Sequence, residues 1–285
     1  MQNRRKNLDI NLINELILNR IKNIARKVLP ERLIRLTRGM VYGWHGNYSS
    51  WNEAKKRCTG YNSSIIIDKV KDSTLKVKNG KAVYERDSVL FDSIQYSYPV
   101  LSGLMWIAAR NNGKLNVLDF GGAVGSSFYQ NKKFLDSLNE VNWCIVEQPD
   151  FIKVGIESFE DEKLHFFYSI EECLKSFDIH VVLLSSVLQY LEKPFIILDQ
   201  LKSTGIKYLI IDRTPFIIGP DRITVQKVHP KIYKGSYPCW FFNKSNFIQY
   251  MASCSKAIIE FDSLDKANIK SEFKGFLFEF VNNTL

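Results

Sequence analysis

A glycine-rich turn is the part of this sequence best suited to chemistry. Asp119 precedes Gly121, Gly122 and Gly125 directly after a short apolar run, and only glycine lets a ligand approach a strand end this closely. Glu147 closes the next apolar run, where a carboxylate can accept hydrogen bonds from both hydroxyls of a ribose. Together they predict a site for a nucleoside-containing cofactor. For the glycines alone, a tight turn without a ligand is the alternative.

The positions of the glycines and of the acidic residues also indicate which cofactor the site binds. A nicotinamide-dependent enzyme would use the same Glu147, so that residue does not distinguish the two cofactors. The nicotinamide fingerprint, however, has glycine where this chain has Phe120. The carboxylate of Asp119, two residues before the first glycine, suits the methionyl amine of S-adenosylmethionine. The turn therefore favours S-adenosylmethionine.

The elements that position these residues alternate regularly from residue 115 onward. Short apolar runs separated by helical stretches are typical of βαβ units with a parallel sheet. We expect parallel strands over 115–120, 142–147, 164–168, 179–185 and 207–212. Further strands are expected over 223–228, 257–261 and 274–280, with a helix over 244–254. The predicted fold is α/β and Rossmann-like, a mostly parallel seven-stranded sheet with a C-terminal antiparallel hairpin and an N-terminal helical extension.

Three regions are expected along the chain. They are a basic amphipathic helical extension over residues 1–40, an N-terminal cap or lid over 41–100 and a cofactor-binding domain over 101–285. Within the cap, residues 43–64 are rich in glycine, aromatic and small polar residues and predict a structured loop. Apolar residues at helical spacing from Leu90 to Ile107 predict two helices that are separated at Pro99.

Positive charge is concentrated at the N-terminus. Residues 1–38 hold ten basic and three acidic residues, so they carry +7 of the chain's net +9. The remaining 247 residues carry only +2, so we expect no basic groove for nucleic acid. The segment over residues 8–38 could contact an anionic membrane peripherally or a second subunit. The alternative is that its apolar face docks on the chain's own domain.

Cysteine usage and hydropathy limit the class of protein further. The five cysteines lie far apart and form no Cys-x-x-Cys pair, so neither a metal site nor a disulfide framework is predicted. The chain has no apolar run of about 18 residues or more and no signal-peptide pattern at its N-terminus. We therefore expect a cytoplasmic protein, peripheral at the inner face of the membrane if the basic segment binds lipid.

Several motifs together resemble a bacterial family assigned as class I S-adenosylmethionine-dependent methyltransferases. The matching segments, over about residues 43–280, are Glu85–Phe91, Asn116–Gly122, Val146–Gln148, Leu184–Leu191, Ile211–Pro215 and Tyr237–Phe242. The segment Ser185–Pro194 resembles the one that borders the methyl donor in such enzymes. Family members are often encoded among genes for surface polysaccharides, which implies a sugar or another small metabolite as acceptor. The cofactor-binding residues expected are Asp119, Gly121, Gly122, Gly125, Glu147, Gln148, Ser185 and Ser186.

The acceptor pocket is expected at the carboxyl ends of the fourth and fifth strands. Tyr190, Asp212 and Arg213 are the candidate catalytic residues there, although Asp212 could equally cap a loop with Arg213 as its ion-pair partner. A base is optional, because in-line methyl transfer depends mainly on holding donor and acceptor together. We expect the loop through 237–240 and the segment 85–98 to cover the pocket. The aromatic residues that could line it are Tyr96, Tyr98, Tyr190, Tyr237 and Trp240.

The function expected is methyl transfer from S-adenosylmethionine, directed at an oxygen of a sugar or small metabolite in surface polysaccharide biosynthesis. One alternative is an NAD-dependent oxidoreductase or epimerase of nucleotide sugars. Another is a non-catalytic subunit that binds S-adenosylmethionine and recruits a partner, which nothing in the sequence excludes.

Overall fold

A computed structural model describes residues 41–59 and 63–281 of the chain, and one compact unit begins at Trp44. The basic segment predicted over residues 1–40 lies outside the described residues, and the three-part division of the chain stays a prediction. No helix in the described ranges is both long enough and apolar enough to cross a membrane.

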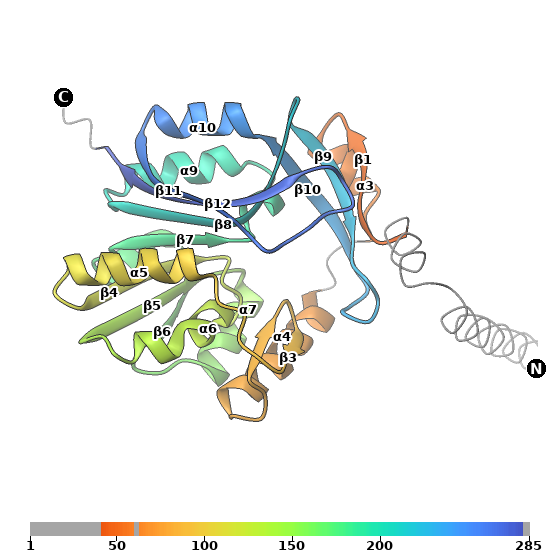
Figure 1. Ribbon diagram of the computed structural model, residues 1–285. Helices are drawn as coiled ribbons and strands as arrows, with labels where there is room; N and C mark the ends of the chain where they lie inside the picture. Colours follow the sequence, from red (N-terminus) through yellow and green to blue (C-terminus); the bar gives the residue numbers. More distant parts are fainter. Residues whose placement is uncertain (1–40, 60–62, 282–285) are drawn as a thin grey trace, which may run out of the picture. The chain divides into compact units, whose positions relative to one another are not determined.

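A ten-stranded sheet forms the centre of this unit (Figure 1). Its parallel strands are β4 (Lys114–Phe120), β5 (Glu140–Val146), β6 (Leu164–Phe167), β7 (Val181–Ser185) and β8 (Tyr208–Ile217). Strand β12 (Glu272–Phe280) runs antiparallel to β8, and β11 (Ser255–Asp262) runs antiparallel to β12. The order β6-β5-β4-β7-β8-β12-β11 confirms the predicted Rossmann-like sheet with its C-terminal antiparallel hairpin.

Helices cover both faces of the sheet, because neighbouring residues of a strand point to opposite sides. Val117 and Ile210 contribute to one core and Leu118 and Ile211 to the other. The first core is covered by α4 (Ser63–Lys78), α5 (Tyr98–Arg110), α6 (Ser126–Leu135) and α7 (Pro149–Ser158). The second is covered by α8 (Ile170–Ser176), α9 (Pro194–Ser203) and α10 (Lys244–Ala252). Because these strands are buried on both faces, they appear in the sequence as continuous apolar runs.

Strand β10 (Ser236–Asn243) replaces the loop expected through 237–240, so that prediction was wrong. It pairs antiparallel with β9 (Arg222–Lys227), and its last two residues, Phe242 and Asn243, pair parallel with β8. A proline inside a run normally argues against a strand. Pro238 is tolerated because β10 has a single partner strand at that position.

The N-terminal part also differs from expectation. Strand β1 (Gly43–Tyr48), which neighbours β9, and helix α3 (Trp51–Lys56) replace the structured loop predicted over 43–64. Helix α3 begins at a capping residue that the loop-like composition concealed, because the Ser50 side chain accepts a hydrogen bond from Glu53 N.

One helix, rather than the predicted two, leads into the core. A hairpin of β2 (Tyr84–Arg86) and β3 (Val89–Phe91) comes first, and α5 follows it. Pro99 lies in the first turn of α5, where the backbone N–H groups have no helical partner in any case. It therefore begins the helix instead of breaking it. At the hairpin turn Asp87 and Ser88 have φ of 53° and 66°, the left-handed values that a two-residue hairpin turn requires.

Candidate cofactor and acceptor site

The glycine turn directly follows β4. Strand β4 lies between β5 and β7 in the sheet, and the strand order reverses there. Gly121 has φ of 76°, and its N–H donates to Val146 O over 2.9 Å. A Cβ on Gly121 would lie 2.5 Å from Val187 Cγ2, and one on Gly122 would lie 2.5 Å from the Asp119 carboxyl group. A larger residue at either position would therefore force the neighbouring side chain or the turn to move. The turn thus offers bare backbone at the carboxyl edge, the place where ligands bind in open α/β sheets.

Glu147 lies beside this turn, as predicted from its place after the second strand. The register that pairs Phe120 with Val146 puts it next to Gly121. Glu147 is half-buried, and burial raises the pKa of its carboxyl group, although the bond from Gln148 N opposes this. Such a carboxyl group can accept a hydroxyl donor. Gln148 is exposed and directly precedes α7 as its N-cap residue.

Asp119 is deeply buried, with 1% of its surface exposed. Trp143 Nε1 donates to its Oδ2 over 3.0 Å, and Gly122 covers the carboxyl group. Burial raises the pKa of Asp119 to about 7, and the charge of Glu147 adds to the rise while the Trp143 hydrogen bond opposes it. A cation bound at the turn would favour the ionised form. Contact between Asp119 and a methionyl amine stays a prediction.

Strained backbone marks the same edge of the sheet. Ala123, Ser186 and Arg213 have φ of 52°, 59° and 57° although none of them is glycine. Ala123 and Ser186 follow the ends of β4 and β7, and Arg213 lies within β8, directly after the residue paired with the end of β7. Ser186 N donates to Asp212 O over 3.0 Å, which joins β7 and β8 where Ser185 and Asp212 are paired. Strain of this kind persists where surrounding structure imposes it, commonly at ligand sites.

Asp212 makes loop-capping contacts, which were one of the two roles predicted for it. It is buried, and its Oδ1 accepts from Arg213 N over 2.8 Å and from Ser263 Oγ over 2.7 Å. Burial raises the pKa of this carboxyl group, while the Ser263 hydrogen bond and the charge of Arg213 lower it. These bonds fix the middle of β8 against the β11–β12 loop, and a catalytic role of Asp212 remains a prediction.

Arg213 binds two carboxylates, neither of which is Asp212. Its Nε donates to Asp265 Oδ2 over 2.8 Å, and one terminal nitrogen donates to Asp265 Oδ1 over 3.1 Å and to Asp87 Oδ2 over 2.6 Å. Partial desolvation opposes ionisation of Asp87, but the Arg213 guanidinium outweighs it and holds the pKa of Asp87 below its usual value. Arg213 thus joins the β2–β3 hairpin, β8 and the β11–β12 loop.

A group of tyrosines lies beside this cluster. The Tyr190 hydroxyl donates to Gln226 Oε1 over 2.7 Å, and the Tyr190 ring packs edge-on against Tyr237 at 5.2 Å. The Tyr233 and Tyr237 hydroxyls lie 3.0 Å apart. Burial raises the pKa of Tyr190 well above its usual value, and the charge of Asp87 adds to this. Tyr190 is therefore a neutral hydrogen-bonding group. Gln226, Tyr233 and Asp87 were not singled out from the sequence.

The other expected pocket aromatics lie elsewhere. Tyr96 and Tyr98 pack together at 5.7 Å, and Tyr96 also packs against Phe134 on α6. Trp240 and Tyr237 are separated by three positions on β10, so they point to opposite sides of that strand. The five aromatic residues do not form a single lining, and that expectation was wrong.

Glu85 anchors the hairpin to the cofactor turn. It is 2% exposed, and it accepts hydrogen bonds from Ser126 Oγ, from Ser88 N over 3.2 Å and from Thr74 Oγ1 over 3.4 Å. Ser126 is the first residue of α6, directly after Gly125. The only sequence signal for this role was the place of Glu85 in a family-like motif.

Within the described ranges, no group of three or more His, Cys, Asp or Glu residues could hold a metal ion.

No family model matches the chain, and no curated protein matches its sequence. One similar solved structure is the 1,6-didemethyltoxoflavin-N1-methyltransferase of Burkholderia thailandensis with its substrate and S-adenosylhomocysteine bound, at 10% identity over 84% of this chain and 94% of that one, with a TM-score of 0.42. Another is an S-adenosylmethionine-bound amino pentose methyltransferase from Micromonospora echinaspora, at 9% identity over 66% and 92%, with a TM-score of 0.41.

A third similar structure is the magnesium protoporphyrin IX methyltransferase of Synechocystis with S-adenosylhomocysteine bound. It is 12% identical over 75% of this chain and 100% of that one, with a TM-score of 0.45. Each of the three was solved with the methyl donor or its demethylated product, the cofactor expected here. At these identities and TM-scores, the α/β assignment of this chain rests on its own strand order.

Proposed function

We propose that this protein transfers a methyl group from S-adenosylmethionine to an oxygen of a sugar or another small metabolite in surface polysaccharide biosynthesis. The observation that carries the proposal is the glycine turn, which has no room for a side chain at Gly121 or Gly122 unless Val187 or Asp119 moves, and which lies beside Glu147 at the reversal of the sheet order. Phe120 stands where a nicotinamide-binding turn has glycine, which favours S-adenosylmethionine over NAD.

The donor site would be formed by three neighbouring strand ends. The turn at Gly121 and Gly122 would approach the donor with bare backbone, and Glu147 would accept the ribose hydroxyls. The half-buried Ser185 and Ser186 would border it from the end of β7. When bound, S-adenosylmethionine supplies an electrophilic methyl group on a sulfonium centre. The protein has to hold the acceptor in line with that group and exclude water.

The acceptor site would lie over the ends of β7 and β8, where Tyr190 and Arg213 meet the hairpin. The Tyr190 hydroxyl would hydrogen-bond an acceptor oxygen, and Arg213 would hold the site closed through Asp87 and Asp265. Asp212 would fix the backbone of Arg213. The exposed Asp87 carboxylate is ionised and could take the proton that an alcohol acceptor releases.

Binding of S-adenosylhomocysteine tests the donor site. We expect calorimetry to show micromolar affinity for S-adenosylhomocysteine and no binding of NAD. Glu147→Ala should weaken the affinity by roughly 1–3 kcal/mol, because polar partners in the complex lose their acceptor. Glu140→Ala is the matched control, since Glu140 begins β5, the strand that Glu147 follows, and binds Lys114 at the opposite edge of the sheet.

The control variant should bind like the wild type. Comparable binding of NAD, or no binding of S-adenosylhomocysteine by the wild type, would rule out the methyltransferase proposal. Binding without any methyl transfer to a cell extract would favour the non-catalytic subunit instead.

The basic segment over residues 8–38 is proposed to attach the protein peripherally to the inner face of the membrane, where it would meet polysaccharide precursors. We expect the full chain to sediment with vesicles that contain anionic lipid and not with neutral vesicles. Reversing two charges, Lys22→Glu with Arg26→Glu, should reduce the bound fraction several-fold. If the wild type and the charge-reversal variant sedimented equally, the segment would instead dock on the protein itself or on a second subunit.

A further inference from the structure

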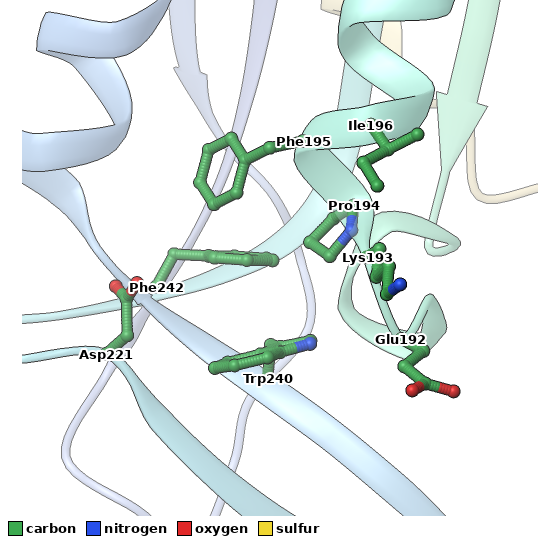
Figure 2. Close-up of a pocket in the computed structure, with 8 residues that line it drawn as sticks. All are labelled: Glu192, Lys193, Pro194, Phe195, Ile196, Asp221, Trp240 and Phe242. Carbon is green, nitrogen blue, oxygen red and sulfur yellow. The ribbon is translucent and has the colours of Figure 1, made fainter. Parts of the chain in front are cut away.

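A pocket of about 260 Å³ lies between β10 and the beginning of α9 (Figure 2). Its apolar floor consists of Pro194, Phe195, Trp240 and Phe242, and its exposed rim consists of Glu192, Lys193, Ile196 and Asp221. The pocket is separate from the Tyr190 group, because Trp240 and Phe242 point to the opposite side of β10 from Tyr237. Neither the glycine turn nor the Arg213 cluster contributes a residue to it.

The Trp240 ring is fixed in place before any ligand binds. Its Nε1 donates to Leu191 O over 3.0 Å. The Trp51 ring stacks on it with centroids 5.9 Å apart and an angle of 21°, and Phe242 lies nearly parallel to it, at 16° and 6.2 Å. A ligand that stacks on this platform therefore pays little conformational entropy to order it.

The rim adds hydrogen-bonding groups of both charges. Figure 2 shows Asp221 on one side of the pocket and Glu192 and Lys193 on the other. Asp221 Oδ1 accepts from Asn243 N over 2.5 Å, which orients the carboxylate. In the described part of the chain, Glu192 and Lys193 form no ion pair or side-chain hydrogen bond, so both can bind a ligand. Two carboxylates and one ammonium give the rim a net charge of −1, which disfavours phosphate and carboxylate ligands.

We propose that this pocket binds one uncharged sugar ring. The C–H face of a pyranose would pack on the part of the half-buried Trp240 ring that Trp51 and Phe242 leave uncovered, and its hydroxyls would bond to Glu192, Lys193 and Asp221. The volume suits a single ring, because pockets for drug-sized ligands span roughly 300–1,000 Å³. A purely apolar ligand would make no use of the three charged groups at the rim. The site would hold the protein on a glycan independently of methyl transfer.

Saturation-transfer NMR on the full chain tests this site with four probes. They are the methyl β-glycosides of glucose, galactose and N-acetylglucosamine, and cyclohexanol as an apolar probe. S-adenosylhomocysteine is added in excess so that the donor site is filled. We expect millimolar binding of at least one glycoside and weaker binding of cyclohexanol. Trp240→Leu should weaken glycoside binding at least roughly tenfold, because it removes the stacking surface.

Glu192→Gln gives a second variant with little risk of misfolding, since Glu192 is exposed, and it should weaken binding several-fold. Trp106→Leu is the matched control, because Trp106 is 38% exposed on α5 and lines no part of the pocket. Binding of no glycoside would overturn the proposal. It would also fail if cyclohexanol bound as tightly as the glycosides, or if neither pocket variant weakened binding more than Trp106→Leu did.

Discussion

Gly121→Ala should reduce the affinity for S-adenosylhomocysteine at least roughly 100-fold. The new Cβ would lie 2.5 Å from Val187 Cγ2 and 3.1 Å from Val187 Cβ, so either Val187 or the turn has to move. The φ of 76° adds the strain of a left-handed conformation, about 1 kcal/mol. Together these effects displace the backbone that is proposed to face the donor. Calorimetric titration of the folded variant measures the loss.

Gly205→Ala separates the clash from the backbone strain. Gly205 has nearly the same φ, 79°, but a Cβ there would meet nothing within 4 Å. We expect this control to lose about 1 kcal/mol of stability and to retain its affinity. Val187→Ala should restore part of the affinity in the Gly121→Ala background. If Gly121→Ala and Gly205→Ala lost the same amount of affinity, binding would not depend on the contact between Val187 and the turn.

Arg213→Met should reduce methyl transfer roughly 100-fold while it leaves the affinity for S-adenosylhomocysteine nearly unchanged. The variant removes the cation that holds the hairpin through Asp87 and the β11–β12 loop through Asp265. A displacement of about 1 Å at an acceptor site can cost this much in rate. Incorporation of labelled methyl groups into the small-molecule fraction of a cell extract measures the rate.

Stability should fall as well, by about 2–3 kcal/mol, because Asp265 is only 21% exposed and would keep its charge without a partner. The exposed Asp87 should add little to this loss. Lys274→Met is the matched control, since Lys274 is 16% exposed, close to the 17% of Arg213, but its acidic partners are more exposed. Urea unfolding should show a loss below about 1 kcal/mol there. Adding Asp265→Asn to Arg213→Met should recover part of the stability.

Local pattern was sufficient to predict the core of the fold. The parallel strands are buried on both faces, so each is an apolar run that the sequence displays directly. Strand β8 was the exception, because it continues five residues beyond the predicted end, through the polar Arg213 and Thr214. The glycine turn and Glu147 were predictable for the same local reason. Each directly follows a strand, and chain order alone places them at one edge of a parallel sheet.

Tertiary structure alone decided how the acceptor side is built. Asp87 and Asp265 lie 126 and 52 residues from Arg213, and no local spacing connects an arginine with acids that far away. The same holds for Tyr190 and Gln226, which only the pairing of β9 with β10 and the position of β7 bring together. The pairing of Asp212 with the Arg213 backbone replaced the ion pair that was one alternative, because the Arg213 guanidinium binds the distant Asp87 and Asp265 instead. Side-chain identity set what these residues can do, and long-range strand pairing set which of them meet.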